Sequence, residues 1–275
     1  MKKYIFILII LCSVLPQLGA QPNPIVYKHM DSGMLNFKLG KMNAAIDDFG
    51  KAIELRPTYA DAYYSRGVSY LKLRDYSAAR NDFEQTINWN PMDAQAFYYK
   101  GECNRSLRNY AEANTDFTSA LAYGKDTDPS TIKYKRAEAR MAIKDYTGAE
   151  ADYKDALAKY PNGYVIFYRL SLMLYAQNRY DESLTYLNTI LEKNARHINA
   201  RMLRANIYLY RDEYAKAIAD YSAVIAQDPN YATPYFQRAM AFRGSKKIMQ
   251  ACRDLEIAQE LGYPSAESMR RQICK

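Results

Sequence analysis

One motif recurs through most of this 275-residue chain at a period close to 34 residues. Its anchor is an aromatic residue or a leucine that follows an aspartate or a tyrosine. The seven anchors are Phe49, Phe83, Phe117, Tyr153, Leu187, Tyr221 and Leu255. Five of the six intervals are 34 residues, and the third is 36. A repeat of this length indicates copies of one supersecondary unit, each of which packs only against its neighbours.

Small residues stand at fixed distances before each anchor. Four residues before it are Ala45, Ala79, Ala113, Ala149, Ser183, Ala217 and Ala251. Sixteen residues before it are Gly33, Gly67, Gly101, Ala137, Ser171, Ala205 and Ala239. A proline ends four of the repeats, at Pro57, Pro91, Pro161 and Pro229. Small side chains let two helices approach closely, the anchors fill the space between hairpins, and proline ends a helix.

Each repeat contains two stretches with the periodicity of a helix. In the second repeat, apolar residues recur at helical spacing over Tyr63–Leu73 and again over Tyr76–Ile87. The polar pair Arg74-Asp75 separates the two stretches and predicts a turn. Glycine and proline are scarce, at 11 and 10 residues, which also favours helices. The pattern therefore predicts an all-α protein built from helical hairpins.

The chain resembles the tetratricopeptide repeat family over roughly Val26 to Tyr263. The second repeat carries the family's signature at Tyr63, Gly67, Tyr70, Tyr76, Ala79, Phe83 and Pro91. It departs from the signature only at Arg66, where the family prefers leucine, and at Thr86, where it prefers alanine. The resemblance implies a right-handed α-solenoid, or superhelix, of about seven hairpins with a C-terminal capping helix.

This resemblance, together with the residues that end each repeat, divides the chain into segments. They are a signal peptide over 1–20, a short linker over 21–25, seven repeats over 26–59, 60–93, 94–129, 130–163, 164–197, 198–231 and 232–263, and a capping helix over 264–275. The third repeat ends in Gly124-Lys125 instead of proline, and the segment Asp126–Pro129 carries two extra residues, which predicts a longer turn there. The fifth repeat is the most divergent of the seven.

The first twenty residues have the pattern of a signal peptide. Lys2 and Lys3 precede an apolar run of about twelve residues, Tyr4–Leu15, and a small-residue end follows at Gly19-Ala20. The run is shorter than the roughly 20 residues that span a bilayer. We therefore expect cleavage after Ala20, no stable membrane span afterwards, and a periplasmic or secreted protein; a retained anchor is the alternative.

Export also bears on the kinds of partner. Removal of Lys2 and Lys3 lowers the formal net charge of +8 by two, to +6. This surplus favours acidic partners, but it is spread along the chain without a basic block. Nucleic-acid binding is therefore not expected.

A basic residue and an aspartate recur at one position each. One residue before the small residue of the first helix stand Arg66, Lys100, Arg136, Arg204 and Arg238. One residue before the anchor stand Asp82, Asp116, Asp152, Asp220 and Asp254. The fifth repeat loses both together, with Leu170 and Tyr186, which favours ion pairs within a repeat, and only Ser32 against Asp48 is mismatched. We expect the pairs to fix helix register; the alternative is that they line a binding surface.

The family resemblance implies a concave surface lined by the first helix of each repeat, which takes a segment of a partner protein. By the family's pattern the fifth residue of each repeat faces this groove. After Met30 in the first repeat, these residues are Tyr64, Tyr98, Tyr134, Tyr168, Met202 and Phe236. Flanking residues include Lys72, Arg105, Tyr175, Tyr210 and Arg243.

A row of tyrosines suits recognition, because each offers a large apolar area with a polar tip. The alternative is that these rings only pack between helices. Family members that clamp a partner's terminal carboxylates have a basic fifth residue followed by asparagine at the ninth. Here the fifth residues are aromatic or methionine and only Asn206 matches at the ninth, so such a clamp is not expected.

Three cysteines follow the predicted cleavage site. Cys103 falls on an inner face and is expected to be a small buried hydrophobe. Cys252 lies ten residues before Gly262, and Cys274 lies ten residues after Pro264. Equal distances from a turn place two residues of an antiparallel hairpin at the same level. Since export permits oxidation, we predict a Cys252–Cys274 disulfide that holds the capping helix; two unpaired thiols are the alternative.

The sequence shows no pattern of an active site. The two histidines, His29 and His197, lie more than four repeats apart, and no cluster has metal-ligand spacing. No phosphate loop, nucleophile elbow or zinc-protease motif is present. We therefore predict no catalytic residue, no cofactor and no metal.

The predicted function is a non-enzymatic scaffold of the bacterial cell envelope that binds a protein or peptide segment in the concave groove. Two alternatives stay open. One is a structural subunit of an envelope assembly or secretion complex, which would use convex or edge surfaces. The other is an accessory protein that binds glycan or peptidoglycan through the tyrosine row.

Overall fold

The computed structural model describes residues 23–124 and 128–274, and these residues form fifteen α-helices and no β-strand. The helices are α1 (Pro24–Lys38), α2 (Met42–Leu55), α3 (Ala60–Lys72), α4 (Tyr76–Trp89), α5 (Ala94–Ser106), α6 (Tyr110–Tyr123), α7 (Pro129–Ala142), α8 (Tyr146–Lys159), α9 (Tyr164–Ala176), α10 (Tyr180–Lys193), α11 (Ile198–Tyr210), α12 (Tyr214–Gln227), α13 (Ala232–Gly244), α14 (Ile248–Glu260) and α15 (Ala266–Ile273). An N-terminal body ends at Arg108 and holds α1 to α5; a C-terminal body begins at Asn109 and holds α6 to α15.

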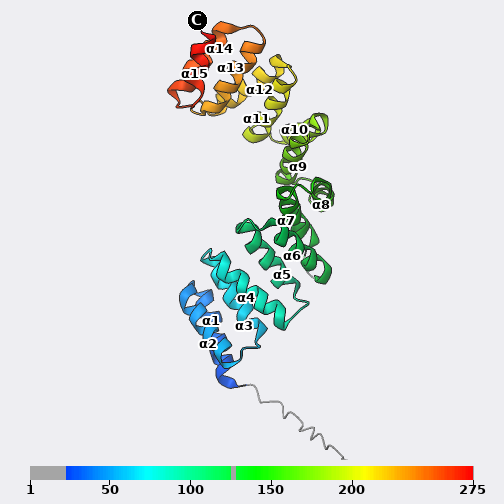
Figure 1. The fold of residues 1–275 in the computed structure, drawn as a ribbon, viewed down its shortest axis with the longest axis vertical. Helices are drawn as coiled ribbons and strands as arrows, with labels where there is room; N and C mark the ends of the chain where they lie inside the picture. The colour runs from blue at the N-terminus through cyan, green and yellow to red at the C-terminus, as the bar shows by residue number, and fades with distance from the viewer. Residues whose placement is uncertain (1–22, 125–127, 275) are drawn as a thin grey trace, which may run out of the picture. The chain divides into compact units, whose positions relative to one another are not determined.

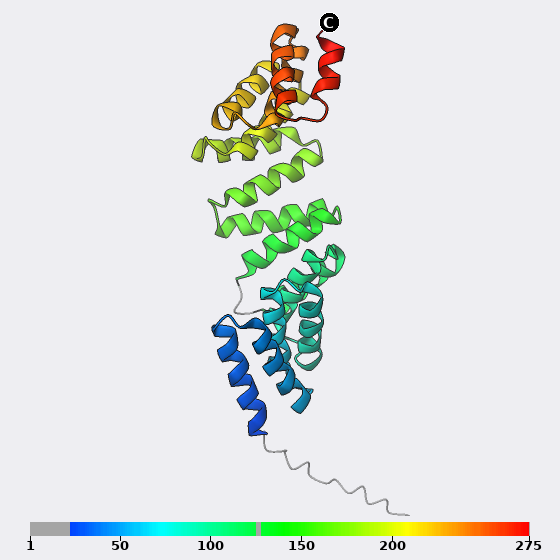
Figure 2. The ribbon, with the colours of Figure 1, turned by 90° about the vertical axis from the view of Figure 1, so that its left-hand side faces the viewer.

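Within each body, consecutive helices run antiparallel and pack side by side as stacked hairpins (Figure 1 and Figure 2). The all-α hairpin fold predicted from the sequence is therefore confirmed. Helix α1 begins two residues earlier than predicted, because Pro24 occupies its first turn and the Asn23 side chain accepts a hydrogen bond from Ile25 N. The predicted signal peptide, and residues 125–127 of the predicted long turn, lie outside the described residues.

The turns inside the repeats share one backbone geometry. One residue at each turn has a positive φ: Gly40, Arg74, Arg108, Lys144, Asn178, Asp212 and Lys246. In the second repeat, Arg74 N donates to Leu71 O at 3.0 Å and Asp75 N donates to Tyr70 O at 3.0 Å. This is the hydrogen-bond pattern of a Schellman motif, which satisfies the last carbonyls of the first helix. A left-handed residue other than glycine costs about 1–2 kcal/mol, so the recurring turn is maintained against a local penalty.

The anchors form the core of the hairpins. All seven are fully buried. In the first repeat the anchor packs directly on the small residue of the facing helix, since a Cβ added to Gly33 would lie 2.6 Å from Phe49 Cε1. In the C-terminal body, Ala137 and Tyr153 share one buried cluster, and Ala239 and Leu255 share another. A larger side chain at the small positions would separate the two helices.

Beside this core, a paired arginine and aspartate join the two helices of a repeat. Arg66 donates from Nε and Nη2 to Asp82, at 2.9 and 2.8 Å. The same two-bond geometry, with distances of 2.7–2.8 Å, joins Arg136 to Asp152, Arg204 to Asp220 and Arg238 to Asp254. In the first repeat, Ser32 Oγ donates to Asp48 Oδ2 at 2.6 Å, so the expected mismatch is a hydrogen bond. Lys100 and Asp116 lie in different bodies, and their pair stays a prediction.

Three of these arginines also contact a third helix. Arg136 Nη1 donates to Thr118 Oγ1 on α6 at 3.2 Å, Arg204 Nη1 to Asn188 Oδ1 on α10 at 2.8 Å, and Arg238 Nη1 to Ser222 Oγ on α12 at 2.8 Å. Each acceptor follows an anchor of the preceding repeat. One guanidinium therefore fixes the two helices of its own repeat and the second helix of the repeat before it.

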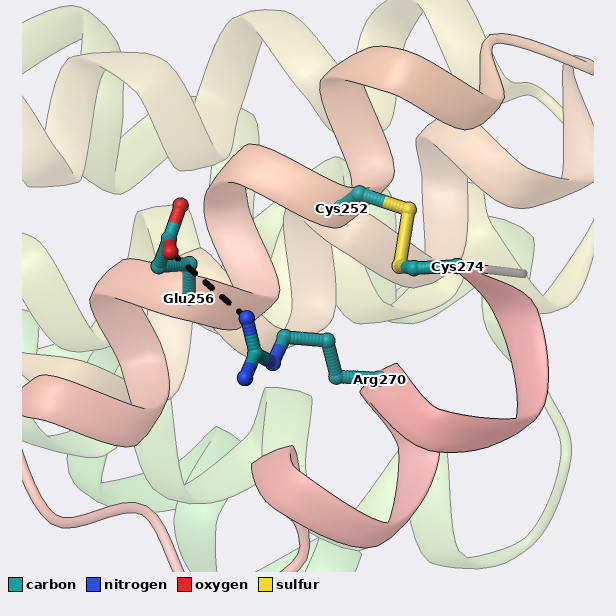
Figure 3. Close-up of a disulfide and its surroundings, with 4 residues drawn as sticks. All are labelled: Cys252, Glu256, Arg270 and Cys274. Atoms are coloured by element: carbon teal, nitrogen blue, oxygen red, sulfur yellow. Dashed lines mark ion pairs between the residues drawn. A yellow bond between two sulfur atoms is a disulfide. The ribbon is translucent and has the colours of Figure 1, made fainter.

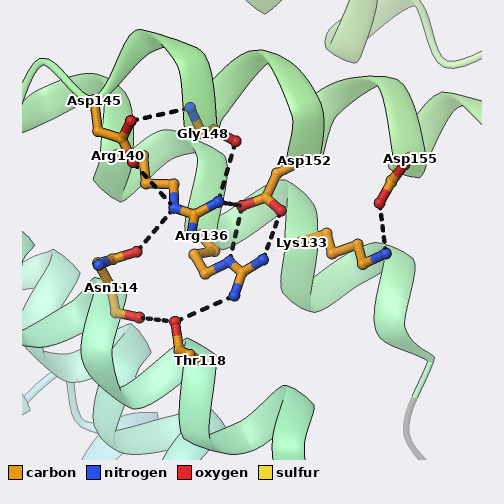
Figure 4. A network of polar contacts seen from close by, with 9 residues as sticks. All are labelled: Asn114, Thr118, Lys133, Arg136, Arg140, Asp145, Gly148, Asp152 and Asp155. Carbon is orange, nitrogen blue, oxygen red and sulfur yellow. Dashed lines mark hydrogen bonds and ion pairs between the residues drawn. The ribbon is translucent and has the colours of Figure 1, made fainter.

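An extended network of this kind lies at the joint between the third and fourth repeats (Figure 4). Arg140 Nη1 donates to Asp152 Oδ2 at 2.8 Å and to the Gly148 carbonyl at 3.1 Å, while its Nε donates to Asn114 Oδ1 at 3.1 Å. Asp152 thus accepts hydrogen bonds from two arginines of α7. These bonds tie α6, α7 and α8 together where the repeat has its two extra residues.

The fifth repeat shows that an apolar contact can replace the ion pair. Leu170 is fully buried, and the Tyr186 ring lies 5.9 Å from that of Phe167. At Asp82, burial raises the pKa even though Arg66 lowers it, so the loss of hydration outweighs pairing at that carboxylate. A buried ion pair of this kind stabilises little relative to well-packed apolar residues.

The C-terminal end is closed by α15. Ala266 of this helix is buried beside Tyr235 and Ala258, and Met269 and Ile273 pack on Ala239 and Leu255. A disulfide joins Cys252 on α14 to Cys274 at the end of α15, with Cα atoms 5.8 Å apart (Figure 3). Arg270 and Glu256 form an ion pair at 3.5 Å between the same helices. Cys103 is buried against Ala79 and Phe83.

The ion pair gives the first prediction. Asp254→Ala leaves Arg238 buried without its carboxylate and is expected to lower the free energy of unfolding by about 3 kcal/mol. The double variant Arg238→Leu/Asp254→Tyr copies the fifth repeat, and its free energy of unfolding is expected to fall by less. Urea unfolding measures both.

A matched control is Glu260→Ala on the same helix, where the side chain is exposed; its effect is expected to stay within about 0.5 kcal/mol. If Asp254→Ala is as mild as this control, the pair does not hold the hairpin.

Candidate partner-binding surface

In the N-terminal body, the predicted groove tyrosines Tyr64 and Tyr98 belong to an aromatic cluster. The ring of Tyr64 on α3 lies 5.8 Å from Phe83 and 6.0 Å from Tyr99, both edge-on. Its hydroxyl donates to Gln95 Oε1 on α5 at 2.9 Å. Burial raises the pKa of Tyr64 well above its ordinary value. The hydroxyl is thus a neutral donor held by the next repeat, and the ring is a fixed wall.

An apolar cavity of about 220 Å³ opens beside this cluster. Its lining comes from the first helices of three successive repeats and from one anchor: Met34, Phe37, Phe49, Tyr64, Ser65, Val68 and Tyr99. Ser65 is its sole hydroxyl-bearing lining residue besides the two tyrosines. The volume and the lining suit an apolar side chain from outside, because burying such a chain removes its surface from water.

The repeat register could have located most of this cavity. Met34 and Phe37 are the ninth and twelfth residues of the first repeat, positions that the family's pattern assigns to the groove. Tyr99 was missed because it is a sixth residue. Its neighbour Tyr98, the predicted fifth residue, does not line the cavity; the two rings lie 5.2 Å apart. Burial raises the pKa of Tyr98 to about 12, so this phenol is neutral at physiological pH.

In the C-terminal body, the predicted groove tyrosines Tyr134 and Tyr168 lie beside Glu138 and His197. Tyr134 Oη donates to Glu138 Oε1 at 3.2 Å, and Arg169 Nη2 lies 3.1 Å from the same oxygen. The Tyr168 ring lies 5.8 Å from the His197 ring. A second cavity, of about 310 Å³, is lined by Ser130, Thr131, Tyr134, Tyr160, Val165 and Ile166. Four of these six residues carry a hydroxyl group.

Two predicted groove residues pack against other parts of the chain. Met202 is buried, at 8% exposure, within the core between α11 and α12. Phe236 stacks on Tyr263 with ring centroids 4.4 Å apart, beside the closing helix α15. Both side chains already pack within the chain, and their part in partner binding stays a prediction.

The residues predicted to flank the groove differ in their surroundings. Lys72 and Arg243 are exposed, and Arg105 pairs with Glu102 at 3.0 Å. Tyr175, Tyr180 and Tyr210 form an aromatic row with centroids 5.6 and 4.9 Å apart, and Tyr210 is 67% exposed. Asn206 accepts a hydrogen bond from the buried Tyr221 hydroxyl at 2.6 Å, so it serves the core.

The described residues offer no arrangement typical of a metal centre. Within 23–124 and 128–274, no group of three or more His, Cys, Asp or Glu side chains could hold a metal ion. His197 Nδ1 accepts a hydrogen bond from Ala200 N and so caps α11, and His29 lies 3.9 Å from Asp48. Nor does any helix in these ranges combine the length and apolar character needed to cross a membrane.

Family models match successive parts of the chain. A model described as TPR repeat matches residues 33–74 and 205–243. Two models described as tetratricopeptide repeat match residues 140–207, and 64–129 with 105–164. Together the matches run from residue 33 to residue 243. No curated protein sequence matches the chain significantly.

Solved structures share the fold at low sequence identity. The C-terminal part of a TPR repeat-containing protein from Cytophaga hutchinsonii is 16% identical, with a TM-score of 0.72 over 87% of this chain and 98% of that one. A tetratricopeptide repeat protein from Parabacteroides merdae is 15% identical, with a TM-score of 0.63 over 92% and 100%. PilW, described as a widely conserved type IV pilus biogenesis factor, is 18% identical, with a TM-score of 0.59 over 76% and 96%.

Proposed function

The chain belongs to the tetratricopeptide repeat family, and we propose that it is a non-enzymatic scaffold that holds a segment of another protein on the inner face of its repeats. The observation that carries this proposal is the apolar cavity between Met34, Val68 and Tyr99. A protein segment with a large apolar side chain fills such a site, whereas a glycan would leave its hydroxyls without partners there. The inner face of the N-terminal body is thus the main binding surface.

The proposed location is the bacterial cell envelope, either the periplasm or the outside of the cell. Its support is the basic start and the apolar run of the first twenty residues. The fold is shared with PilW, whose description places that protein in type IV pilus biogenesis. In an oxidising compartment the Cys252–Cys274 bond would persist and hold α15 in place.

A second candidate is a structural subunit that binds through an edge of the repeats. It is favoured by one observation in the N-terminal body. Leu55 and Trp89, at the ends of α2 and α4, and Met92 in the loop that follows are 44%, 49% and 70% exposed. An exposed tryptophan beside exposed aliphatic residues is typical of interface anchors.

Two methionine variants separate these candidates. Met34 lines the cavity and is 42% exposed, so Met34→Asp places a charge in the cavity with little effect on folding. The amount of partner protein captured by crosslinking in the native envelope is expected to be about tenfold or more lower for this variant than for the wild type. Quantitative mass spectrometry of the captured proteins measures the change.

The matched control is Met92→Asp on the loop after α4, which is expected to capture the same proteins as the wild type. The reverse outcome, with capture lost only in Met92→Asp, would replace the inner-face proposal by the edge candidate. If the wild type and both variants capture the same proteins in equal amounts, the inner-face proposal and the edge candidate are both contradicted.

The disulfide has its own test. The mature protein is expected to have an intact mass lower by two hydrogens than after reduction. The bond spans 22 residues, so reduction is expected to cost about 3 kcal/mol of stability. A mass that reductant leaves unchanged would contradict the predicted bond. So would a Cys252→Ser/Cys274→Ser variant with the same melting temperature as the oxidised protein.

A further inference from the structure

The outer face of α1 exposes a position, Leu35, that is buried in all later repeats. The positions equivalent to Leu35 are Ser69, Cys103, Ala139, Met173, Ile207 and Ala241, and each is fully buried. Leu35 itself is 59% exposed. In later repeats this position packs against the repeat before it. In the first repeat it is occupied by a large apolar residue, and no described part of the chain covers it.

Four exposed residues and the half-buried Ser32 follow the spacing of a helix-pairing seam. Ile25, Lys28, Ser32, Leu35 and Leu39 are separated by three, four, three and four residues. Ile25 and Leu39 are 52% and 59% exposed. Alternating steps of three and four place side chains in one stripe along a helix, the geometry by which two helices pack together.

Charges on this face complement the same face of a second copy. Lys28 lies in the stripe, Asp31 lies beside it, and both are exposed. If two α1 helices pack antiparallel about a two-fold axis near Met30, Ile25 of each copy meets Leu35 of the other. The same arrangement brings Lys28 of each copy beside Asp31 of the other, so one surface satisfies both halves of a symmetric interface.

The opposite end of the chain excludes a head-to-tail arrangement. The last hairpin is covered by α15, which is held by the Cys252–Cys274 bond. The outer side of α15 carries the exposed residues Glu267 and Arg271, an i,i+4 ion pair that belongs on a solvated surface. With one end open and the other closed, association ends at two copies and does not form a filament.

We propose that the outer face of α1 is a dimer interface, in which α1 packs antiparallel against α1 of a second copy of this chain. The interface is centred on the face of α1 that carries Lys28 and Leu35, and none of the stripe residues lines the cavity. It is therefore independent of the proposed partner binding, and the protein could dimerise and still bind a segment in each copy.

Sedimentation velocity of the purified protein over a wide concentration range tests this directly. The wild type is expected to shift from monomer to dimer mass as concentration rises. Leu35→Lys is expected to weaken the dimer by about tenfold or more. The matched control is Leu73→Lys, at the C-cap position of α3 that corresponds to Leu39, and it is expected to dimerise as the wild type does.

A charge exchange provides the second arm. Lys28→Glu sets like charges together and is expected to weaken the dimer, while Lys28→Glu/Asp31→Lys is expected to restore it. Circular dichroism confirms that each variant is folded. A wild type that stays monomeric at every concentration, or a dimer that Leu35→Lys leaves intact, would overturn the proposal. A monomer in which Leu35→Lys lowers the melting temperature would overturn it too, because another part of the same chain would then cover the face.

Discussion

The fold depends on the contact between a small residue on the first helix of a repeat and a buried anchor on the second. Gly33 leaves no room for a methyl group against Phe49, so the two helices sit as close as their backbones allow. The hairpin that results still has apolar faces, which it can bury only against the next hairpin. Stacking, the open face of α1 and the need for the closing helix α15 all follow from that constraint.

The arginine junctions set the register that this packing leaves undetermined. Apolar contacts are not directional, whereas a guanidinium that donates two bonds to Asp254 and one to Ser222 fixes three helices at once. The fifth repeat keeps its place without the pair, through Leu170 and Tyr186. Polar pairing therefore contributes specificity of alignment, while burial of the anchors contributes most of the stability.

The sequence could predict most of the fold, because the 34-residue period fixes the helices, the turns and the within-repeat pairs. It could not predict which groove positions are open. Met202 and Phe236 fit the family's pattern, but their exposure depends on how closely α12 and Tyr263 approach, and the pattern does not contain that distance. Tyr99 was missed for the same reason: it is a sixth residue, and its place beside the cavity follows from how it packs against Tyr64 and Phe83.

The central claim is that the first helices of the N-terminal repeats form the binding surface. Hydrogen–deuterium exchange of the protein with and without its captured partner tests it most directly. The claim predicts that the largest slowing of amide exchange falls in α1, α3 and α5, which supply most of the cavity lining. Slowing confined to the ends of α2 and α4 near Leu55 and Trp89, with α1 and α3 unchanged, would contradict it.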